Sequence, residues 1–168
     1  MSIEYVIIIV AVLAFLAIVA VAKMLVERNL KSKAIEQGKE VKSIVLPLRL
    51  QAYERMALFL ERIEPNQLVL RIHAPNLTIA EEQSLLLTAI RSEFEHNITQ
   101  QIYLSDVVWQ HICDAKDDII EIINTVAAQM DENANNITFA ESVLTASAQH
   151  PVVEKAMKVL RADVQRLF

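Results

Sequence analysis

The longest apolar run in the chain lies close to its N-terminus. Residues 5–22, YVIIIVAVLAFLAIVAVA, contain no charged side chain. At ~1.5 Å per residue such a helix covers about 27 Å, close to the ~30 Å hydrocarbon core of a bilayer. The run is apolar on every face, which is untypical of a core helix in a small protein. It predicts a transmembrane helix at residues 5–22, preceded by a short extracytoplasmic N-terminus at residues 1–4.

A cleavable signal peptide is the main alternative interpretation of this run. Ala20-Val21-Ala22 fits the small-x-small pattern of a cleavage site. A signal peptide normally begins with a basic segment, however, whereas only the acidic Glu4 precedes this run. The apolar stretch also exceeds the usual ~7–15 residues. The sequence therefore favours an uncleaved anchor over a signal peptide, with a soluble helix as the third possibility.

Basic residues follow the apolar run and none precedes it. Seven Lys or Arg residues lie between positions 23 and 49, against three acidic ones. The positive-inside rule then leaves the N-terminus outside and the rest of the chain in the cytoplasm, as a single-pass protein of the inner membrane. Residues 23–46 are interpreted as a basic juxtamembrane stem. Its lysines either lie near anionic lipid headgroups or form a solvated spacer.

Residues 47–168 contain several segments whose apolar residues recur at helical spacing. Proline in the first turn and Ser or Thr caps, some with Glu three residues later, typify helix starts. The expected starts are Pro47, Pro65, Thr78 with Glu81, Ser105, Thr138 with Glu141, and Pro151. Residues 66–73 fit a strand or a short helix, and Pro65 with the lack of a partner strand favours the helix. Three later helices have clear inner faces: Ile79, Leu86, Ile90, Phe94 and Ile98; then Val108, Ile112, Ala115, Ile119, Ile122, Val126 and Met130; then Val153, Met157, Leu160, Val164 and Leu167. Short connections favour an antiparallel bundle of about five helices.

The composition supports an all-α fold class. The chain has one glycine, Gly38, and four prolines. Tight sheet turns often use glycine, so the composition favours helices over hairpins. Phosphate-binding loops need several glycines and are excluded. One cysteine, Cys113, allows no internal disulfide. From residue 50 onward seventeen acidic residues face nine basic ones, which argues against nucleic acid as a partner.

Several stretches resemble a family of uncharacterised bacterial single-pass membrane proteins, known only as a domain of unknown function. They are LPLRLQAYERMALFLERIEPNQLVLRIH, LLLTAIRSEFEHNITQQIYLSD, AKDDIIEIINTVA and the terminal RLF. The resemblance extends over nearly the whole chain, including the anchor. It implies an anchored cytoplasmic helical domain, and it supplies no activity, ligand or catalytic residue.

Glu93 and His96 form one Glu-x-x-His, half of the motif that di-iron carboxylate bundles use. Both side chains share a helix face, but a full site needs a second such motif and two further Glu residues, and the sequence has no second Glu-x-x-His. The plainer interpretation is that His96 interacts with carbonyls near a helix C-terminus. No metal-binding residue is assigned, and whether Glu93 and His96 bind a metal stays open.

The remaining polar candidates favour structural roles. His111 and Cys113 point to different sides of a helix and cannot share a metal, and Cys113 is expected to be a buried, inert thiol. His73 and His150, each near a proline, are expected at the surface or at helix caps. Four acidic residues are expected on a solvated helix face, with a docking surface for a basic partner as the alternative: Asp114, Asp117, Asp118 and Glu121.

No catalytic, cofactor-binding or metal-binding constellation emerges from these patterns, and none identifies a small-molecule substrate. The expected function is therefore a membrane-anchored interaction or assembly module without catalysis, in contact with the lipid bilayer and with a protein partner or a second copy. The alternative is a metal-binding carboxylate/His enzyme built in the helical bundle. A stalk subunit of a larger membrane complex ranks third, because Pro47 and compact helices favour a globular end.

Overall fold

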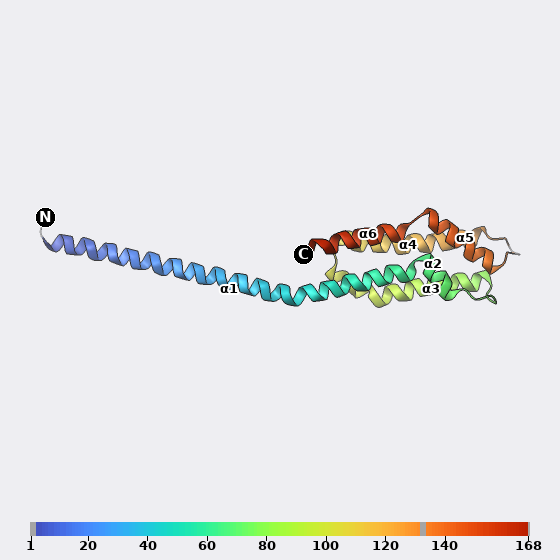
Figure 1. Ribbon diagram of the computed structural model, residues 1–168, viewed down its shortest axis with the longest axis horizontal. Coiled ribbons are helices and arrows are strands. Elements are labelled where there is room, and N and C mark those ends of the chain that lie inside the picture. The colour runs from blue at the N-terminus through green and yellow to red at the C-terminus, as the bar shows by residue number, and fades with distance from the viewer. Residues whose placement is uncertain (1–2, 132–133, 168) are drawn as a thin grey trace. The chain divides into compact units, whose positions relative to one another are not determined.

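The computed structural model is helical throughout the part of the chain that it describes (Figure 1). It describes the backbone of residues 3–131 and 134–167, and the side chains of the same residues except 4–14, 17–18, 26 and 29–41. Six α-helices and two short 3-10 helices follow one another without a β-strand in these ranges: α1 (Ile3–Ile63), α2 (Pro65–Ile72), α3 (Ile79–Asn97), η1 (Ile98–Tyr103), α4 (Asp106–Gln129), α5 (Asn136–Gln149), α6 (Val152–Val164) and η2 (Gln165–Leu167). The predicted all-α class is confirmed.

The chain divides into two compact units, residues 1–45 and residues 46–168. The first unit is helical, and its described large apolar side chains, among them Phe15, Leu16 and Met24, are exposed. The division falls next to the domain start expected at residue 47. The assignment of residues 23–46 as a basic stem stays a prediction, since the side chains of residues 29–41 are not described.

No helix in the described residues combines the length and the apolar character that crossing a bilayer requires. The longest unbroken stretch of described side chains before residue 42 is residues 19–25, which contains Lys23. Most side chains of residues 5–22 lie outside the described part of the chain. On this finding the predicted transmembrane helix at residues 5–22 is wrong. The predicted single-pass location in the inner membrane is wrong as well.

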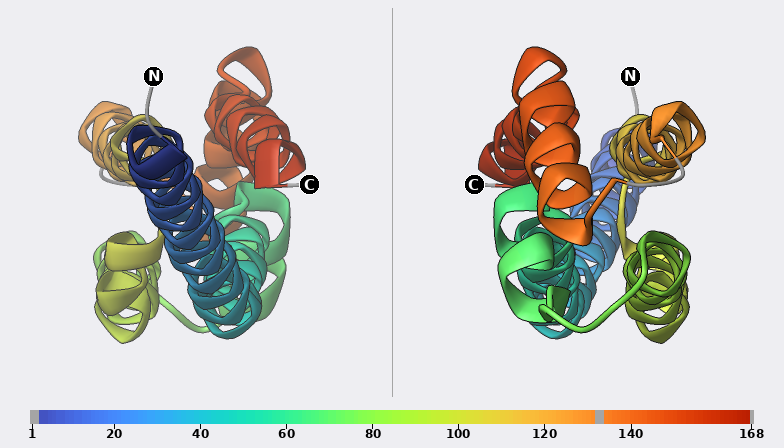
Figure 2. Two further views of the ribbon diagram at one scale, coloured as in Figure 1. Left: turned by 90° about the vertical axis from the view of Figure 1, so that its left-hand side faces the viewer. Right: turned by 90° about the vertical axis from the view of Figure 1, so that its right-hand side faces the viewer.

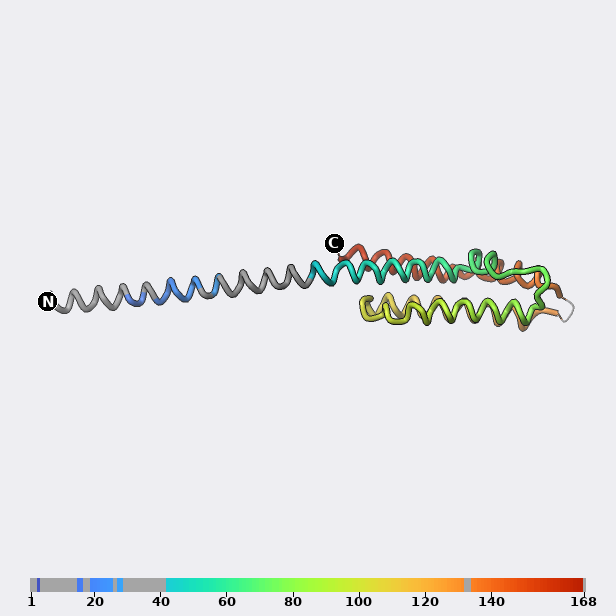
Figure 3. Tube along the Cα trace, turned by 90° about the horizontal axis from the view of Figure 1, so that it is seen from below, coloured from blue at the N-terminus to red at the C-terminus, as the bar shows by residue number. Residues whose placement is uncertain are grey.

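The second unit is a helical bundle with four arms, which confirms the predicted bundle. The last part of α1 with α2 forms the first arm, α3 the second, α4 the third, and α5 with α6 the fourth (Figures 1 and 2). In Figure 3, α3 runs back alongside the end of α1 in the opposite direction. Helix α4 packs against α3, α5 and α6, and α5 also packs against α2.

Local sequence signals explain most helix starts. Pro65 occupies the first turn of α2, where its missing N–H costs nothing. The hydroxyl of Thr78 accepts from the Glu81 backbone N–H, while the Glu81 carboxylate accepts from the Thr78 N–H at 2.8 Å, so the predicted capping box is confirmed. Ser105 caps α4 as expected.

Two predicted starts are wrong. Pro47 lies inside α1 instead of beginning a helix. A proline ring within a helix removes one backbone hydrogen bond. The division between the two units falls between Val45 and Leu46, close to this proline. Helix α5 is capped by Asn135, whose side chain accepts from the Thr138 N–H at 2.8 Å, so Thr138 lies inside the helix rather than at its cap.

The core lies between the four arms and follows the predicted apolar faces with small shifts. Leu86 and Ile90 of α3 are buried, whereas Ile98 is exposed at the start of η1. In α4, Ile123 is buried where the sequence predicted Ile122, which is half-buried. In α6, Ala156 is buried while the predicted Met157 is half-buried. Aromatic rings join three arms, since Phe94 contacts Phe59 at 5.8 Å and stacks on Trp109 at 5.4 Å between ring centroids.

Candidate functional site

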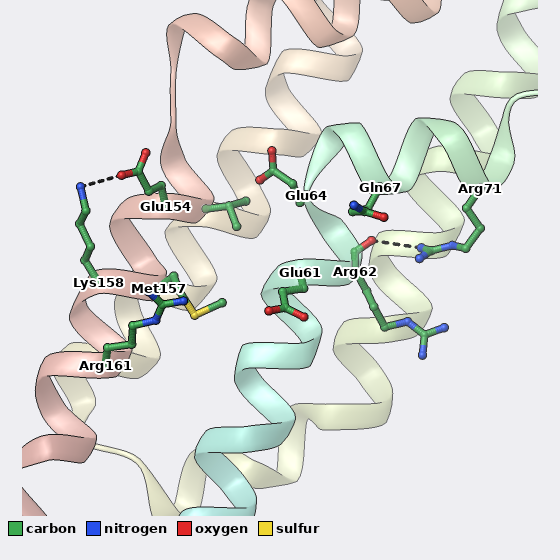
Figure 4. Close-up of a pocket in the computed structure, with 10 residues that line it drawn as sticks. Glu61, Arg62, Glu64, Gln67, Arg71, Glu154, Met157, Lys158 and Arg161 are labelled. Carbon is green, nitrogen blue, oxygen red and sulfur yellow. Dashed lines mark hydrogen bonds and ion pairs between the residues drawn. The ribbon is translucent and has the colours of Figure 1, made fainter.

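A charged groove runs between the first and the last arm of the bundle (Figure 4). Its volume is about 760 Å³. The end of α1 and helix α2 form one wall, and α6 forms the other. The lining residues are Glu61, Arg62, Glu64, Gln67 and Arg71 from the first arm, and Val153, Glu154, Met157, Lys158 and Arg161 from the last.

Helical periodicity places these charges at the groove. At the end of α1, Leu60 and Ile63 are buried, which leaves Glu61 and Arg62 exposed between them. In α6, Ala156 and Leu160 face the core. Glu154, Lys158 and Arg161 then follow at spacings of four and three, so they share the outer face of α6.

Some charges of the groove are already paired. The Arg62 Nε lies 3.0 Å from the Glu93 carboxylate on α3. The Lys158 Nζ lies 2.7 Å from Glu154, one turn earlier in α6. Burial raises the pKa of the Glu64 carboxyl, and the nearby Glu154 raises it further, while the side chain of Asn66 partly opposes the shift.

Two guanidinium groups of the groove have no carboxylate partner within the described residues. Arg71 donates to the backbone carbonyl oxygen of Arg62 at 3.1 Å, and Arg161 forms no ion pair there. In Figure 4 the two side chains come from opposite walls. Residues 46–168 contain ten basic and seventeen acidic residues, and four of the ten line this groove. Three acidic residues, Glu61, Glu64 and Glu154, also line the groove, so its lining has a formal net charge of +1 on an otherwise acidic unit. This local excess of positive charge can attract a negatively charged group.

A second polar feature is a hydrogen-bonded His–Glu pair between the end of α2 and the first turns of α3. The Glu82 side chain is fully buried, and its Oε1 lies 2.9 Å from the Nδ1 of His73, which is 27% exposed. The Glu82 Oε2 has no hydrogen-bond partner among the described atoms. Asn136 of α5 donates to the Ala74 carbonyl oxygen at 2.7 Å and fixes the adjoining loop. The contact between His73 and Glu82 holds the end of α2 against the start of α3.

A third polar cluster closes the end of the bundle near residue 49. The Tyr53 hydroxyl donates to Asp163 Oδ2 at 2.5 Å, and the Ser105 hydroxyl donates to the same oxygen at 3.0 Å. Arg49 donates to the Tyr103 carbonyl oxygen at 3.1 Å. Burial raises the pKa of Tyr53, and its hydrogen bond to Asp163 raises it further. The cluster links α1, η1, the start of α4 and α6 by hydrogen bonds, so its clearest role is to stabilise the packing of these helices.

The variant Tyr53→Phe should lower the free energy of unfolding by about 1–2 kcal/mol at pH 7, because it removes a hydrogen bond to a carboxylate. Since folding raises the pKa of Tyr53, its stabilisation is complete below the unfolded value near 10 and is lost as pH rises through the folded value. Urea unfolding at pH 7 and pH 11 measures both effects. Tyr103→Phe is the control, because Tyr103 contributes its carbonyl oxygen; equal losses in the two variants would contradict the prediction.

The structure separates most of the candidates that the sequence suggested. Glu93 pairs with Arg62, while His96 Nδ1 lies 2.6 Å from the Ser92 carbonyl oxygen, as expected for a histidine near a helix C-terminus. No group of three or more His, Cys, Asp or Glu side chains in the described ranges lies close enough to hold a metal ion. His111 is exposed, and Cys113 is half-buried, with burial raising the pKa of its thiol.

The remaining candidates have mixed outcomes. The acidic residues at positions 114, 117, 118 and 121 are exposed on α4, as expected. His150 is the exposed C-cap residue of α5, as expected. His73 is the C-cap residue of α2, but its pairing with Glu82 was not expected. Glu82, Leu86 and Ile90 follow one another at intervals of four residues, so helical spacing places Glu82 on the buried face of α3. A search for apolar residues alone misses Glu82 because its side chain is charged or polar.

Comparison with known proteins identifies one family. The sequence matches DUF7935, a family of unknown function, over residues 2–167. No curated protein and no solved structure matches the chain significantly. The match confirms the expected resemblance to an uncharacterised family, and it does not show a bacterial origin or a single-pass topology.

Proposed function

The chain belongs to DUF7935, a family of unknown function, and from this premise we propose that residues 46–168 form a protein-docking module that acts by binding rather than by catalysis. Its binding surface is the groove between the first and the last arm. The observation that carries the proposal is the concentration of four of the unit's ten basic residues at this groove, two of them without a carboxylate partner in the described structure.

The groove favours an extended or helical acidic segment over a small molecule. It is open to solvent, and its apolar lining residues are Val153 and Met157. Methionine adapts its shape to different partners, which suits a protein surface. Charges spread over two walls attract a partner with several carboxylates, since complementary charge raises the association rate and selects the partner.

Peptide binding to the full chain tests this function. We expect a twelve-residue helical peptide rich in Glu to bind, and a peptide of equal length rich in Lys not to bind, by isothermal titration calorimetry. The double variant Arg71→Glu/Arg161→Glu should weaken binding of the acidic peptide at least tenfold. Binding should also weaken when salt rises from 0.1 M to 1 M, because the Debye length falls from about 10 Å to about 3 Å.

The matched control is Arg55→Glu/Arg91→Glu, which changes the charge equally at two exposed arginines outside the groove. This variant should keep at least half of the wild-type affinity. Equal binding of both peptides, or equal losses in the two double variants, would show that the groove is not a selective docking surface.

A further inference from the structure

Glu82 is the only buried carboxyl side chain among the residues that the structure describes. None of this side chain is exposed. Its Oε1 lies 2.9 Å from His73 Nδ1, and its Oε2 has no hydrogen-bond partner among the described atoms. An ionised carboxylate in such a place has lost the water around both oxygens and gains one hydrogen bond in return. This loss is costly unless a positive charge or a bound proton compensates it.

No other charged group in the described ranges is placed to compensate Glu82. Helix α5 packs against both α2 and α3, and its buried residues carry no charge. The buried residues of α2 and α4 are apolar. The charged residues on the elements around the pair are exposed or bound to other groups: Arg62, Arg71, Glu81, Glu93, Glu121 and Glu141.

We infer that His73 and Glu82 form a proton-dependent latch. It holds the corner between α2 and α3 closed while the pair carries one proton, and it loosens when that proton is lost. The proton makes the pair neutral overall, whether it resides on the imidazole ring or on the carboxyl group. Without it, His73 can still donate from Nδ1 to Oε1, but Glu82 keeps a full negative charge in the core with its second oxygen unpaired.

The pH dependence of the latch follows from the protons bound in the folded and unfolded states. In an unfolded chain, Glu releases its proton near pH 4.3 and His near pH 6.5. Above about pH 6.5 the folded pair therefore holds one proton that the unfolded chain has released. The stability that the pair provides is complete below this pH and is lost as the pH rises above it. One proton changes the equilibrium constant for unfolding by at most about tenfold per pH unit.

The latch acts on a short helix. Helix α2 has eight residues, and helices of this length are not stable in water without tertiary contacts. Besides the pair, the buried residues of α2 and the hydrogen bond from Asn136 to the Ala74 carbonyl oxygen provide such contacts. Loss of the proton should therefore loosen α2 before the longer helices. The latch does not depend on the proposed docking function, although α2 carries Gln67 and Arg71 of the groove.

Urea unfolding of the full chain at pH 5.5 and pH 8.0, followed by tryptophan fluorescence, tests the inference. In the wild type, the equilibrium constant for unfolding should rise with pH about fivefold more than in Glu82→Gln, which has no ionisable carboxyl group. Glu82→Met provides the same comparison if Glu82→Gln does not fold. Burial raises the pKa of Cys113, but this thiol is present in every variant, so the difference between variants isolates the pair. The control is His111→Gln, which removes an exposed histidine and should retain the wild-type pH dependence.

Hydrogen exchange of the backbone amides locates the effect. After correction for the intrinsic exchange rates, the amides of α2 should lose protection between pH 5.5 and pH 8.0 in the wild type and not in Glu82→Gln. The amides of α4 should change much less. An equal pH dependence of unfolding in the wild type and the Glu82 variants, or loss of the pH dependence in His111→Gln, would overturn the inference. Equal losses of protection in α2 and α4 would also contradict a local latch.

Discussion

Replacing Phe59 by Ala is expected to lower the free energy of unfolding of the bundle by about 3–5 kcal/mol, the range for removal of a buried aromatic ring. Phe59 is fully buried, and its ring lies 5.8 Å from that of Phe94, which in turn stacks on Trp109. The loss combines the transfer energy of the ring with the cavity that it leaves, since Phe94 and Trp109 belong to two other arms and cannot both move inward.

Urea unfolding of the full chain, followed by the fluorescence of its one tryptophan, measures this effect. The neighbouring Leu58 is 51% exposed and provides the control. Leu58→Ala should change the free energy of unfolding by less than about 0.5 kcal/mol, as is usual for surface substitutions. Similar losses in the two variants would mean that the packing described for this face of α1 is incorrect.

The second large effect is expected at the hydrogen-bonded pair of His73 and the buried Glu82. His73→Ala leaves the fully buried Glu82 carboxyl without a hydrogen-bond partner in the described structure, because its second oxygen already has none. Removing one partner of a buried pair is strongly destabilising, and since His73 is partly exposed we expect a loss of about 2–3 kcal/mol.

Changing the other partner should have a much smaller effect. Glu82→Met has a similar volume and replaces the buried carboxyl by an apolar group, so it should be neutral or stabilising. In the double variant His73→Ala/Glu82→Met, most of the loss caused by His73→Ala should disappear. Thermal unfolding of the three variants forms a double-mutant cycle. Additive losses would indicate that the two side chains do not depend on each other.

Sequence signals were reliable where the responsible chemistry is local. Thr78 and Glu81 lie three residues apart and cap α3 without help from the rest of the chain. Pro65 similarly marks the first turn of α2. At the start of α5, Asn135 rather than the predicted Thr138 is the cap. Pro47 shows where such a local rule fails. The rule predicts a helix start at this proline, but α1 continues through it.

The groove could not be predicted, because it depends on the packing of distant segments. Glu61 and Arg71 lie in the first arm and Arg161 in the last, and no local pattern shows that these arms are neighbours. Their contact is set by which apolar faces meet in the core. Glu82 was missed for a different reason: a carboxylate on a buried stripe interrupts the apolar pattern, and its partner His73 lies beyond a helix boundary.

The fastening of the bundle by Tyr53 and Asp163 has a consequence for how the protein is made. These residues are 110 positions apart, and the wall of the groove formed by α6 follows the opposite wall by a comparable stretch of chain. During synthesis the N-terminal wall is therefore complete long before its counterpart exists. A nascent chain has both walls of the groove only after α6 has left the ribosome, so the binding that we propose has to wait until the bundle can close.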